Sequence, residues 1–464
     1  MNVKISTSLI SLFLILPLVY LLYSVIGLSF ENFTYLWNNL LLGYSLNTLY
    51  LVFLTVFFSL ILGLAPAWLI STRKFTGKKF FDIVLFLPLA IPSYIMAFTY
   101  SDLLSFTGPF QSYIRNFYPN IYEYVNVDYL QIEILAFLMA LVLYPYLYTA
   151  CRISFSLLGS NYINIAKNLG MSQFQTFFKI IIPISRVSIF SGLFLIVMEV
   201  LNEYGAVKYF GVNTFTSGIF RSWYSMEDVN TASILAVCLL IIVSIFFILE
   251  RYSTSKYRYN YKSNDSVSGN YSTNKLSYVY IYIICLFPFI LGFFVPVIYI
   301  INNVIKTINI IDFEELLLLS FNSFFLAFIS SIIIVSIAIF FQFIKKISKS
   351  KTVFFFSEIV SLTYALPGAV IALSLIIFLA FISKMIGVSI VFGSVAILIY
   401  AYVMRYMAVG ISPLRSSFDK HPDSFDDTGK NLGMSNFKLF KKIHLPINKT
   451  SIYIAFILCF VDII

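Results

Sequence analysis

Long apolar runs separated by short polar segments dominate the sequence and restrict what this chain can fold into. A helix needs about 20 apolar residues to cross a hydrocarbon core about 30 Å thick. Eleven such runs occur, at 5–28, 47–70, 80–100, 129–150, 187–203, 231–250, 278–301, 322–344, 353–382, 386–410 and 450–464. With 60% hydrophobic and only 11% charged residues, a soluble globular fold is excluded. We expect an all-α, polytopic membrane protein.

Two segments of the same layout, 161–186 and 424–449, show that the chain is internally duplicated. Lys-Asn-Leu-Gly-Met-Ser occurs at 167–172 and again 263 positions later, at 430–435. At the same offset, Phe174, Phe177, Lys179, Ile180 and Pro183 recur as Phe437, Phe440, Lys442, Ile443 and Pro446. At an offset of 275, Asn47, Thr48 and Pro92 correspond to Asn322, Ser323 and Pro367.

The duplication predicts two parallel repeats of about six transmembrane helices. The first half is expected at 1–250, a polar cytoplasmic linker at 251–277, and the second half at 278–464. Eleven spans are present where duplication predicts twelve, so we expect the second half to be truncated, with its last span missing.

Each repeated segment is expected to form a helix–turn–helix between membrane spans. Gly170 and Gly433 suit the left-handed position that follows a helix, and Ser172 and Ser435 suit the N-cap of the next one. Gln175 can complete a capping box with Ser172. Two further features recur: prolines that would end or kink the second helix (Pro183, Pro446), and an apolar face (Phe174, Phe177 and Phe178; Phe437 and Phe440). One copy could be a surface helix folded back on its bundle, but two copies favour a partner-docking element.

This pattern resembles the EAA loop of bacterial ABC-transporter permeases, roughly E-A-A-x-x-x-G, nine variable positions and then I-x-L-P. The resemblance implies that a short coupling helix in each loop docks in a groove of an ATP-binding subunit. The residues it assigns to coupling are Asn164, Gly170, Ser172, Phe174, Phe177, Pro183, Asp427, Gly433, Ser435, Phe437, Phe440 and Pro446. The acidic position of the motif is Asn164 in the first loop and Asp427 in the second, so coupling is expected to be asymmetric.

The segment after the first loop resembles the ferric-iron branch of these permeases. The residues that carry this resemblance are Glu203, Tyr204, Gly205, Val207, Tyr209, Phe210, Gly211, Val212, Thr214, Phe215 and Thr216. It implies the fused permease of a ferric-iron importer, with two ATP-binding subunits that bind ATP and Mg, and a periplasmic or lipid-anchored solute-binding protein. No cofactor is expected on this chain.

Other functions stay open. The same architecture could import thiamine, sulfate, polyamine or phosphonate, and an ion-coupled secondary transporter would need no nucleotide. A membrane enzyme is disfavoured, because the sequence has no P-loop, nucleophile elbow or paired metal-ligand motif. We expect no catalytic residue and assign no metal site.

Carboxylates inside apolar runs are the candidates for a translocation path. An ionisable group in a membrane helix costs about 2.5–3.5 kcal/mol and usually faces a polar interior or a partner. Glu199 and Asp462 occupy the same repeat position, and Glu203 lies near the external end of its span. Pro92 and Pro367 predict breaks that free backbone carbonyls. For the carboxylates the alternative is a structural hydrogen bond or ion pair between helices, and for the prolines a simple kink.

The basic residues predict the topology. The net charge of +10 is spread over short loops, which indicates orientation rather than nucleic-acid binding. All but five of the 31 Lys and Arg residues fall on one side, which we take as cytoplasmic. The five are Arg115, Lys208, Arg221, Lys306 and Lys384. We expect a multi-pass protein of the bacterial cytoplasmic (inner) membrane, with the N-terminus and both EAA-like loops inside.

Overall fold

The computed structural model describes residues 3–27, 34, 37–157, 162, 165–166, 168–255, 275–348, 350, 353, 355, 360, 366–387, 393–419, 421–422 and 424–464. In these ranges the regular structure is helical and no strand occurs. The expected linker core at 256–274, together with Asn164, lies outside the described residues.

The described helices match the expected spans. Nine of them are long and apolar enough to cross a membrane, and two helix pairs bent at a short break bring the number to eleven. All eleven coincide with the runs recognised in the sequence, so the all-α polytopic fold is confirmed.

The chain divides into two compact units, and each is described by itself. One unit comprises 31–228 and 241–309. Its helices are η1 (Trp37–Leu41), α3 (Leu42–Thr72), α4 (Lys78–Val84), η2 (Leu87–Ala90), α5 (Ser93–Leu104), α6 (Pro109–Phe117), α7 (Pro119–Val125), α8 (Ile132–Leu157), α10 (Gln173–Thr176), η3 (Phe177–Ile181), α11 (Ile182–Asn202), α12 (Gly205–Tyr209), α13 (Phe215–Phe220), η4 (Arg221–Ser225), α15 (Lys275–Phe289), η5 (Ile290–Phe294) and α16 (Val295–Thr307).

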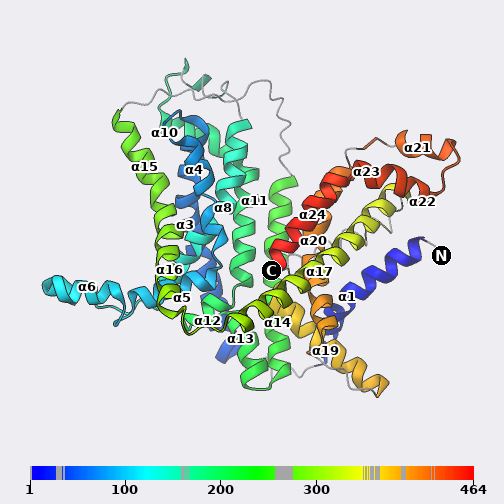
Figure 1. Cartoon of the computed structure of the whole chain (residues 1–464), viewed down its shortest axis with the longest axis horizontal. Helices are drawn as coiled ribbons and strands as arrows, with labels where there is room; N and C mark the ends of the chain where they lie inside the picture. The colour runs from blue at the N-terminus through cyan, green and yellow to red at the C-terminus, as the bar shows by residue number, and fades with distance from the viewer. Residues whose placement is uncertain are drawn as a thin grey trace. The chain divides into compact units, whose positions relative to one another are not determined.

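The core of this unit is α8, which lies between α3 and α11 (Figure 1). Tyr144 and Tyr148 of α8 are fully buried, and the Tyr144 hydroxyl donates to the Leu85 carbonyl at 2.9 Å. Gly192 of α11 lets that helix approach closely, since a Cβ there would lie 2.9 Å from the Cα of Leu147.

The other unit comprises 1–30, 229–240 and 310–464. Its helices are α1 (Val3–Ile26), α17 (Phe313–Ser348), α19 (Gly368–Ile386), α20 (Val395–Phe418), α21 (Ser424–Asn431), α22 (Asn436–Leu439), η7 (Phe440–His444), α23 (Leu445–Ile447) and α24 (Lys449–Ile463). Helix α14 (Val229–Ser255) contributes to both units. Helices α17, α20 and α24 pack together in the core of this unit.

The first span of each half packs among helices of the other half. Helix α1 packs on α19, and the ring of its Phe13 stacks on that of Tyr400 in α20 at 4.6 Å. Helices α15 and α16 pack against α3 and α5, and the Tyr100 hydroxyl donates to the Leu291 carbonyl at 2.6 Å. The compact units therefore interleave the two sequence halves, whose boundaries stay a prediction.

The expected break at Pro92 is present. The helix Lys78–Ala90 and the segment Ser93–Phe117 are bent by 88° at this point. Pro92 has an extended ψ of 144° and caps α5, and Pro367 takes a nearly identical conformation, with ψ 138°, before α19. The predicted equivalence of the two prolines therefore holds at the level of the backbone.

Close contact between α8 and α11 yields a test of this packing. Replacing Gly192 with Val places new atoms against the backbone of α8, and such overpacking costs about 1–3 kcal/mol. The thermal unfolding midpoint of the purified chain in detergent is expected to fall. Gly43→Val is the matched control, because nothing lies within 4 Å of a Cβ at Gly43. Equal midpoints for the two variants would contradict the packing.

Candidate functional site

Both repeated loops turn at a glycine in the left-handed conformation. The φ angles are +71° at Gly170 and +74° at Gly433. In each loop the next amide closes the helix behind it: Met171 N donates to Ala166 O, and Met434 N donates to Gly429 O, both at 3.0 Å. This is the hydrogen bond that closes a Schellman turn, which favours glycine because it has no Cβ. The left-handed conformation expected of Gly170 and Gly433 is confirmed.

The serines that follow are N-caps, as expected. Ser172 and Gln175 form a reciprocal capping box, with hydrogen bonds of 3.0 and 3.2 Å. In the second loop the Ser435 hydroxyl accepts from Lys438 N at 3.4 Å, without the return bond. The two loops thus have the same turn and the same N-cap serine, but only the first has a complete capping box.

The prolines act differently from the expectation. In both copies the short helix passes through a π-helical turn, Phe177–Ile181 and Phe440–His444, which lie 263 positions apart. After the first π-turn, the helix neither ends nor breaks at Pro183 but continues as one span, Gln173–Asn202. In the second copy it continues past Pro446 and breaks at Asn448, with a bend of 74°. A proline in the first turn after a π-turn lacks only an amide that has no helical partner, so the helix tolerates it.

An aromatic cluster anchors each loop to the ends of the spans. In the first unit described, the ring of Phe177 lies 5.3 Å from that of Trp68 and 6.2 Å from that of Phe155. At the equivalent repeat position, the Phe440 ring lies 4.9 Å from that of Phe343. Phe177 and Phe440 were expected on the docking face, but they are partly buried against the spans.

The outer surface of each loop exposes two large apolar side chains. Phe174 is 72% exposed and Phe437 is 73% exposed, as the docking interpretation expects. Leu169 and Leu432, which sequence reasoning missed, are exposed to 71% and 72%. The sequence could have singled out both leucines, because both lie in the identical Lys-Asn-Leu-Gly-Met-Ser stretch. We call Leu169 with Phe174, and Leu432 with Phe437, the two apolar pairs.

The second loop has a buried polar core, and the sequence has isoleucine at both equivalent positions of the first loop. His444 Nε2 lies 2.6 Å from Asp426 Oδ1, with the two side chains 3% and 8% exposed. The His444 ring is stacked on Phe418 at 5.5 Å. The residue equivalent to His444 in the first loop is Ile181, which is also buried. Asp427, the expected acidic position, is exposed beside this core.

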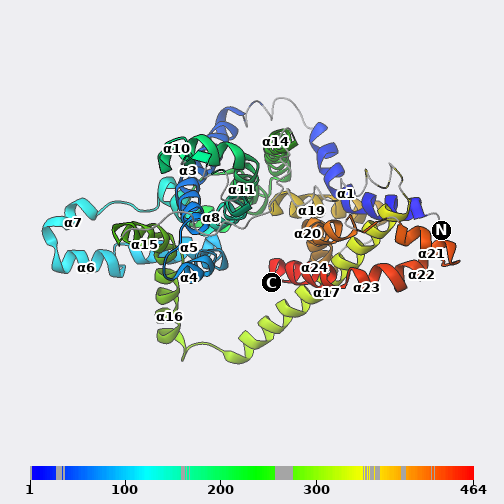
Figure 2. The ribbon, with the colours of Figure 1, turned by 90° about the horizontal axis from the view of Figure 1, so that it is seen from above.

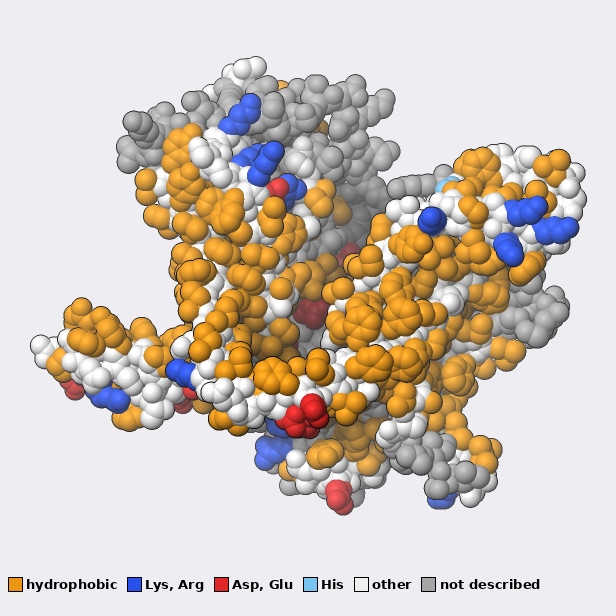
Figure 3. Space-filling view, in the orientation of Figure 1, with side chains coloured by type: hydrophobic (Ala, Val, Ile, Leu, Met, Phe, Trp, Pro, Cys, Tyr) orange, Lys and Arg blue, Asp and Glu red, His pale blue; other side chains and the backbone are white. Residues whose placement is uncertain are grey.

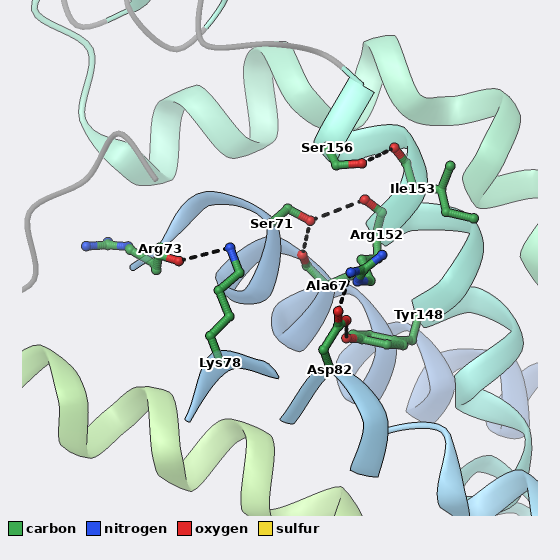
Figure 4. A network of polar contacts seen from close by, with 9 residues as sticks. All are labelled: Ala67, Ser71, Arg73, Lys78, Asp82, Tyr148, Arg152, Ile153 and Ser156. Atoms are coloured by element: carbon green, nitrogen blue, oxygen red, sulfur yellow. Dashed lines mark hydrogen bonds and ion pairs between the residues drawn. The ribbon is translucent and has the colours of Figure 1, made fainter. Parts of the chain in front are cut away.

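A polar network joins the first loop to two spans. Figure 4 shows Asp82 of α4 between Arg152 and Tyr148 of α8; Arg152 forms an ion pair with it, and the Tyr148 hydroxyl donates to it at 3.1 Å. The Lys78 ammonium donates to the Arg73 carbonyl at 3.3 Å. The Arg73 guanidinium in turn donates to Gln173, the first residue of α10. The loop is therefore hydrogen-bonded to the α3–α4 connection.

The path candidates fall into two groups, one in each unit. Glu203 accepts from Ala206 N at 2.9 Å and also bonds Ser93, which follows Pro92. These bonds cap α12, and the place of Glu203 in a translocation path stays a prediction. Glu199 lies half-buried in α11.

In the other unit, Asp462 of α24 lies within electrostatic reach of Arg405. Arg405 was counted with the cytoplasmic residues but lies inside α20, within a candidate span. Its guanidinium fills the space over Gly368, the residue after Pro367. Among the described residues, no three His, Cys, Asp or Glu side chains are placed to hold a metal ion.

Fold and site together define a polytopic helical membrane protein with two matched surface loops. Residues 56–259 match the family described as "binding-protein-dependent transport system inner membrane component". An Fe(3+)-transport system permease protein of Haemophilus influenzae is 26% identical over 428 residues, covering 90% of this chain and 78% of the relative. A sulfate transport system permease of Escherichia coli is 26% identical over 44% of this chain and 72% of its own. A molybdenum transport system permease of Haemophilus influenzae is 26% identical over 34% and 67%. The chain is thus similar to transport permeases over most of its length, and 56–259 match the inner membrane component of binding-protein-dependent transport systems.

The buried pair of the second loop can be tested by a double-mutant cycle. Removing one partner of a buried pair costs about 3–5 kcal/mol, because the other is left without compensation. Asp426→Ala and His444→Ile are each expected to lower the unfolding free energy in detergent by about that much. The double variant, which gives position 444 the isoleucine of the first loop, is expected to lose clearly less than the sum. Additive losses would contradict the pairing.

Proposed function

We propose that this chain is the fused membrane subunit of an ATP-driven importer of ferric iron. The observation that carries the proposal is the length of the likeness to the Fe(3+)-transport permease, which spans 90% of this chain and so extends into both halves. The sulfate and molybdenum relatives match less than half of the chain. An external solute-binding protein would deliver the iron, and ATP and Mg would be bound by the ATP-binding subunits.

Each apolar pair is proposed to receive one ATP-binding subunit. Four large apolar side chains, each more than 70% exposed, recur at equivalent positions in the two loops. Exposed apolar groups on short rigid helices are typical of helix-in-groove recognition. The basic residues support a cytoplasmic location: in the unit that contains 424–449, the Lys and Arg side chains in view gather mainly at the end that carries the loop (Figure 3). Excess positive charge marks the cytoplasmic side.

The loops are linked directly to helices that carry the candidate path carboxylates. The helix Gln173–Asn202 includes the first apolar pair's Phe174 at one end and Glu199 near the other. At 1.5 Å per residue it spans roughly 45 Å, so a push on the loop is carried across the membrane. In the second copy the break at Asn448 separates the loop from α24, which carries Asp462. We propose that the subunits move the two halves unequally.

Substitution of the apolar pairs tests the docking. Leu169→Ser with Phe174→Ser, and Leu432→Ser with Phe437→Ser, remove the apolar contacts, and loss of such anchor residues costs about 2 kcal/mol or more each. Co-purification of the ATP-binding subunit from membranes is expected to fall at least tenfold. Ile310→Ser, at a site 83% exposed in a connection outside both loops, is the control and should change nothing. Retained co-purification with both pairs removed would overturn the docking.

The cargo is tested by isotope uptake. Vesicles containing the permease, its ATP-binding subunit and its solute-binding protein are expected to accumulate radioactive ferric iron in the presence of ATP, and not without it. Uptake of labelled sulfate and of labelled molybdate is measured in the same vesicles, because the other relatives are named for sulfate and molybdenum transport. Sulfate is the second candidate, because relatives carry that function in their names and Arg405 places a positive charge inside a span. ATP-dependent uptake of sulfate without uptake of iron would show that the proposed substrate is wrong, but that the chain still acts in an ATP-driven importer.

A further inference from the structure

We infer that the arm formed by α6 and α7 lies on the membrane surface, with the apolar face of α6 among lipid headgroups and the first acyl carbons. The arm comprises 109–125, between the break at Pro92 and α8. The inference is independent of the transported cargo. It concerns a surface that has no counterpart of equal length in the second half, where the repeat offset drops from 275 to 263.

Helix α6 is strongly amphipathic, but its apolar face is turned away from the protein. Phe110, Tyr113, Ile114 and Phe117 share one face at i, i+3, i+4 and i+7 spacing. Three of them are exposed, Phe110 to 39%, Tyr113 to 55% and Phe117 to 67%. On the polar side, Gln111 is buried and Ser112 and Arg115 are half-buried. A helix that exposes its apolar face needs an apolar medium or partner on that side.

The protein holds the polar face in place. Gln111 is only 3% exposed, and its amide donates to the Leu104 carbonyl at 2.9 Å. The Arg115 guanidinium lies over the ring of Phe106 at 4.6 Å and over that of Tyr122 at 5.7 Å. Cation–π contacts of this kind order the helix without covering its apolar face. The exposure of that face is thus fixed by contacts on the opposite side.

The direction of the arm fits a surface position. The segment Ser93–Phe117 is bent by 88° from the helix Lys78–Ala90. Within this unit, α6 and α7 extend away from the bundle of α3, α8 and α11, at the end opposite α10, in both views of the ribbon (Figures 1 and 2). Because the arm leaves the bundle at the end of its spans, a position at the membrane interface fits it.

The chemistry of the face favours lipid over a protein partner. In Figure 3 the apolar atoms of the arm gather mainly on the side toward the loop-bearing end of its unit, where the membrane would lie, and the charged atoms on the other side. None of the four side chains of the apolar face is charged. The rings of Tyr113 and Phe117 lie 4.8 Å apart and are tilted with respect to each other, and aromatic rings of this kind are enriched where membrane meets water.

Spin labelling tests the inference in the full chain. Nitroxide labels at Phe117→Cys and Tyr113→Cys probe the apolar face, and labels at the adjacent Asn116→Cys and Ser112→Cys are matched controls. The chain is reconstituted in vesicles of phosphatidylethanolamine and phosphatidylglycerol. Collision rates are measured with oxygen, which concentrates in the bilayer, and with a water-soluble nickel chelate. The chain without added cysteines gives the background from the four native thiols.

The ratio of oxygen to nickel collisions is expected to be several-fold higher at 113 and 117 than at 112 and 116. Equal ratios at all four positions, or a higher nickel rate at 113 and 117, would overturn the inference. Addition of the solute-binding protein is expected to leave the ratios unchanged. If that protein instead immobilises the labels at 113 and 117 and shields them from both reagents, the face is a protein-docking surface and the lipid assignment is wrong.

Discussion

Everything proposed for the loops depends on the aromatic packing that holds each surface helix to the ends of the spans. The ring of Phe177 is held between Trp68 and Phe155, and Phe440 meets Phe343 at the same repeat position. Aromatic pairs of this kind contribute about 0.5–1.5 kcal/mol beyond the burial of their area. With the inner side fixed, the glycine turn directs the leucine before it and the phenylalanine after it outward. A short helix without such an anchor could not transmit force to a span.

The two loops have the same backbone conformation but differ in their buried side chains. Ile181 fills the first core, whereas the second contains His444 with Asp426. The first helix continues unbroken from loop to span, and the second is bent by 74° at Asn448. The first loop is therefore continuous with the span that follows it, whereas a bend separates the second loop from its span. This difference supports the proposal that the two halves are coupled unequally, independently of the acidic position that the motif comparison singled out.

Sequence reasoning worked where the physics is local. The left-handed turn at Gly170, the cap at Ser172 and the break at Pro92 follow from the conformations that single residues favour. It failed where the answer depends on distant packing. Helical spacing placed Phe177 on the outer face, but rings from two other helices draw it inward.

The same limit applies to larger features. Nothing in the spacing of the runs showed that α1 packs with the second half. The sequence also did not show that the Glu203 carboxylate accepts a hydrogen bond from the Ala206 amide of α12; its place in a translocation path stays a prediction.

The most direct test of the account is photo-cross-linking from the two apolar pairs in intact membranes. A photoreactive amino acid at Phe174, and separately at Phe437, is expected to attach this chain to the ATP-binding subunit at both positions. A third site, Ile310, should give no such product. Cross-links from neither loop, or labelling of either loop by reagents that act only from outside the cell, would contradict the central claim.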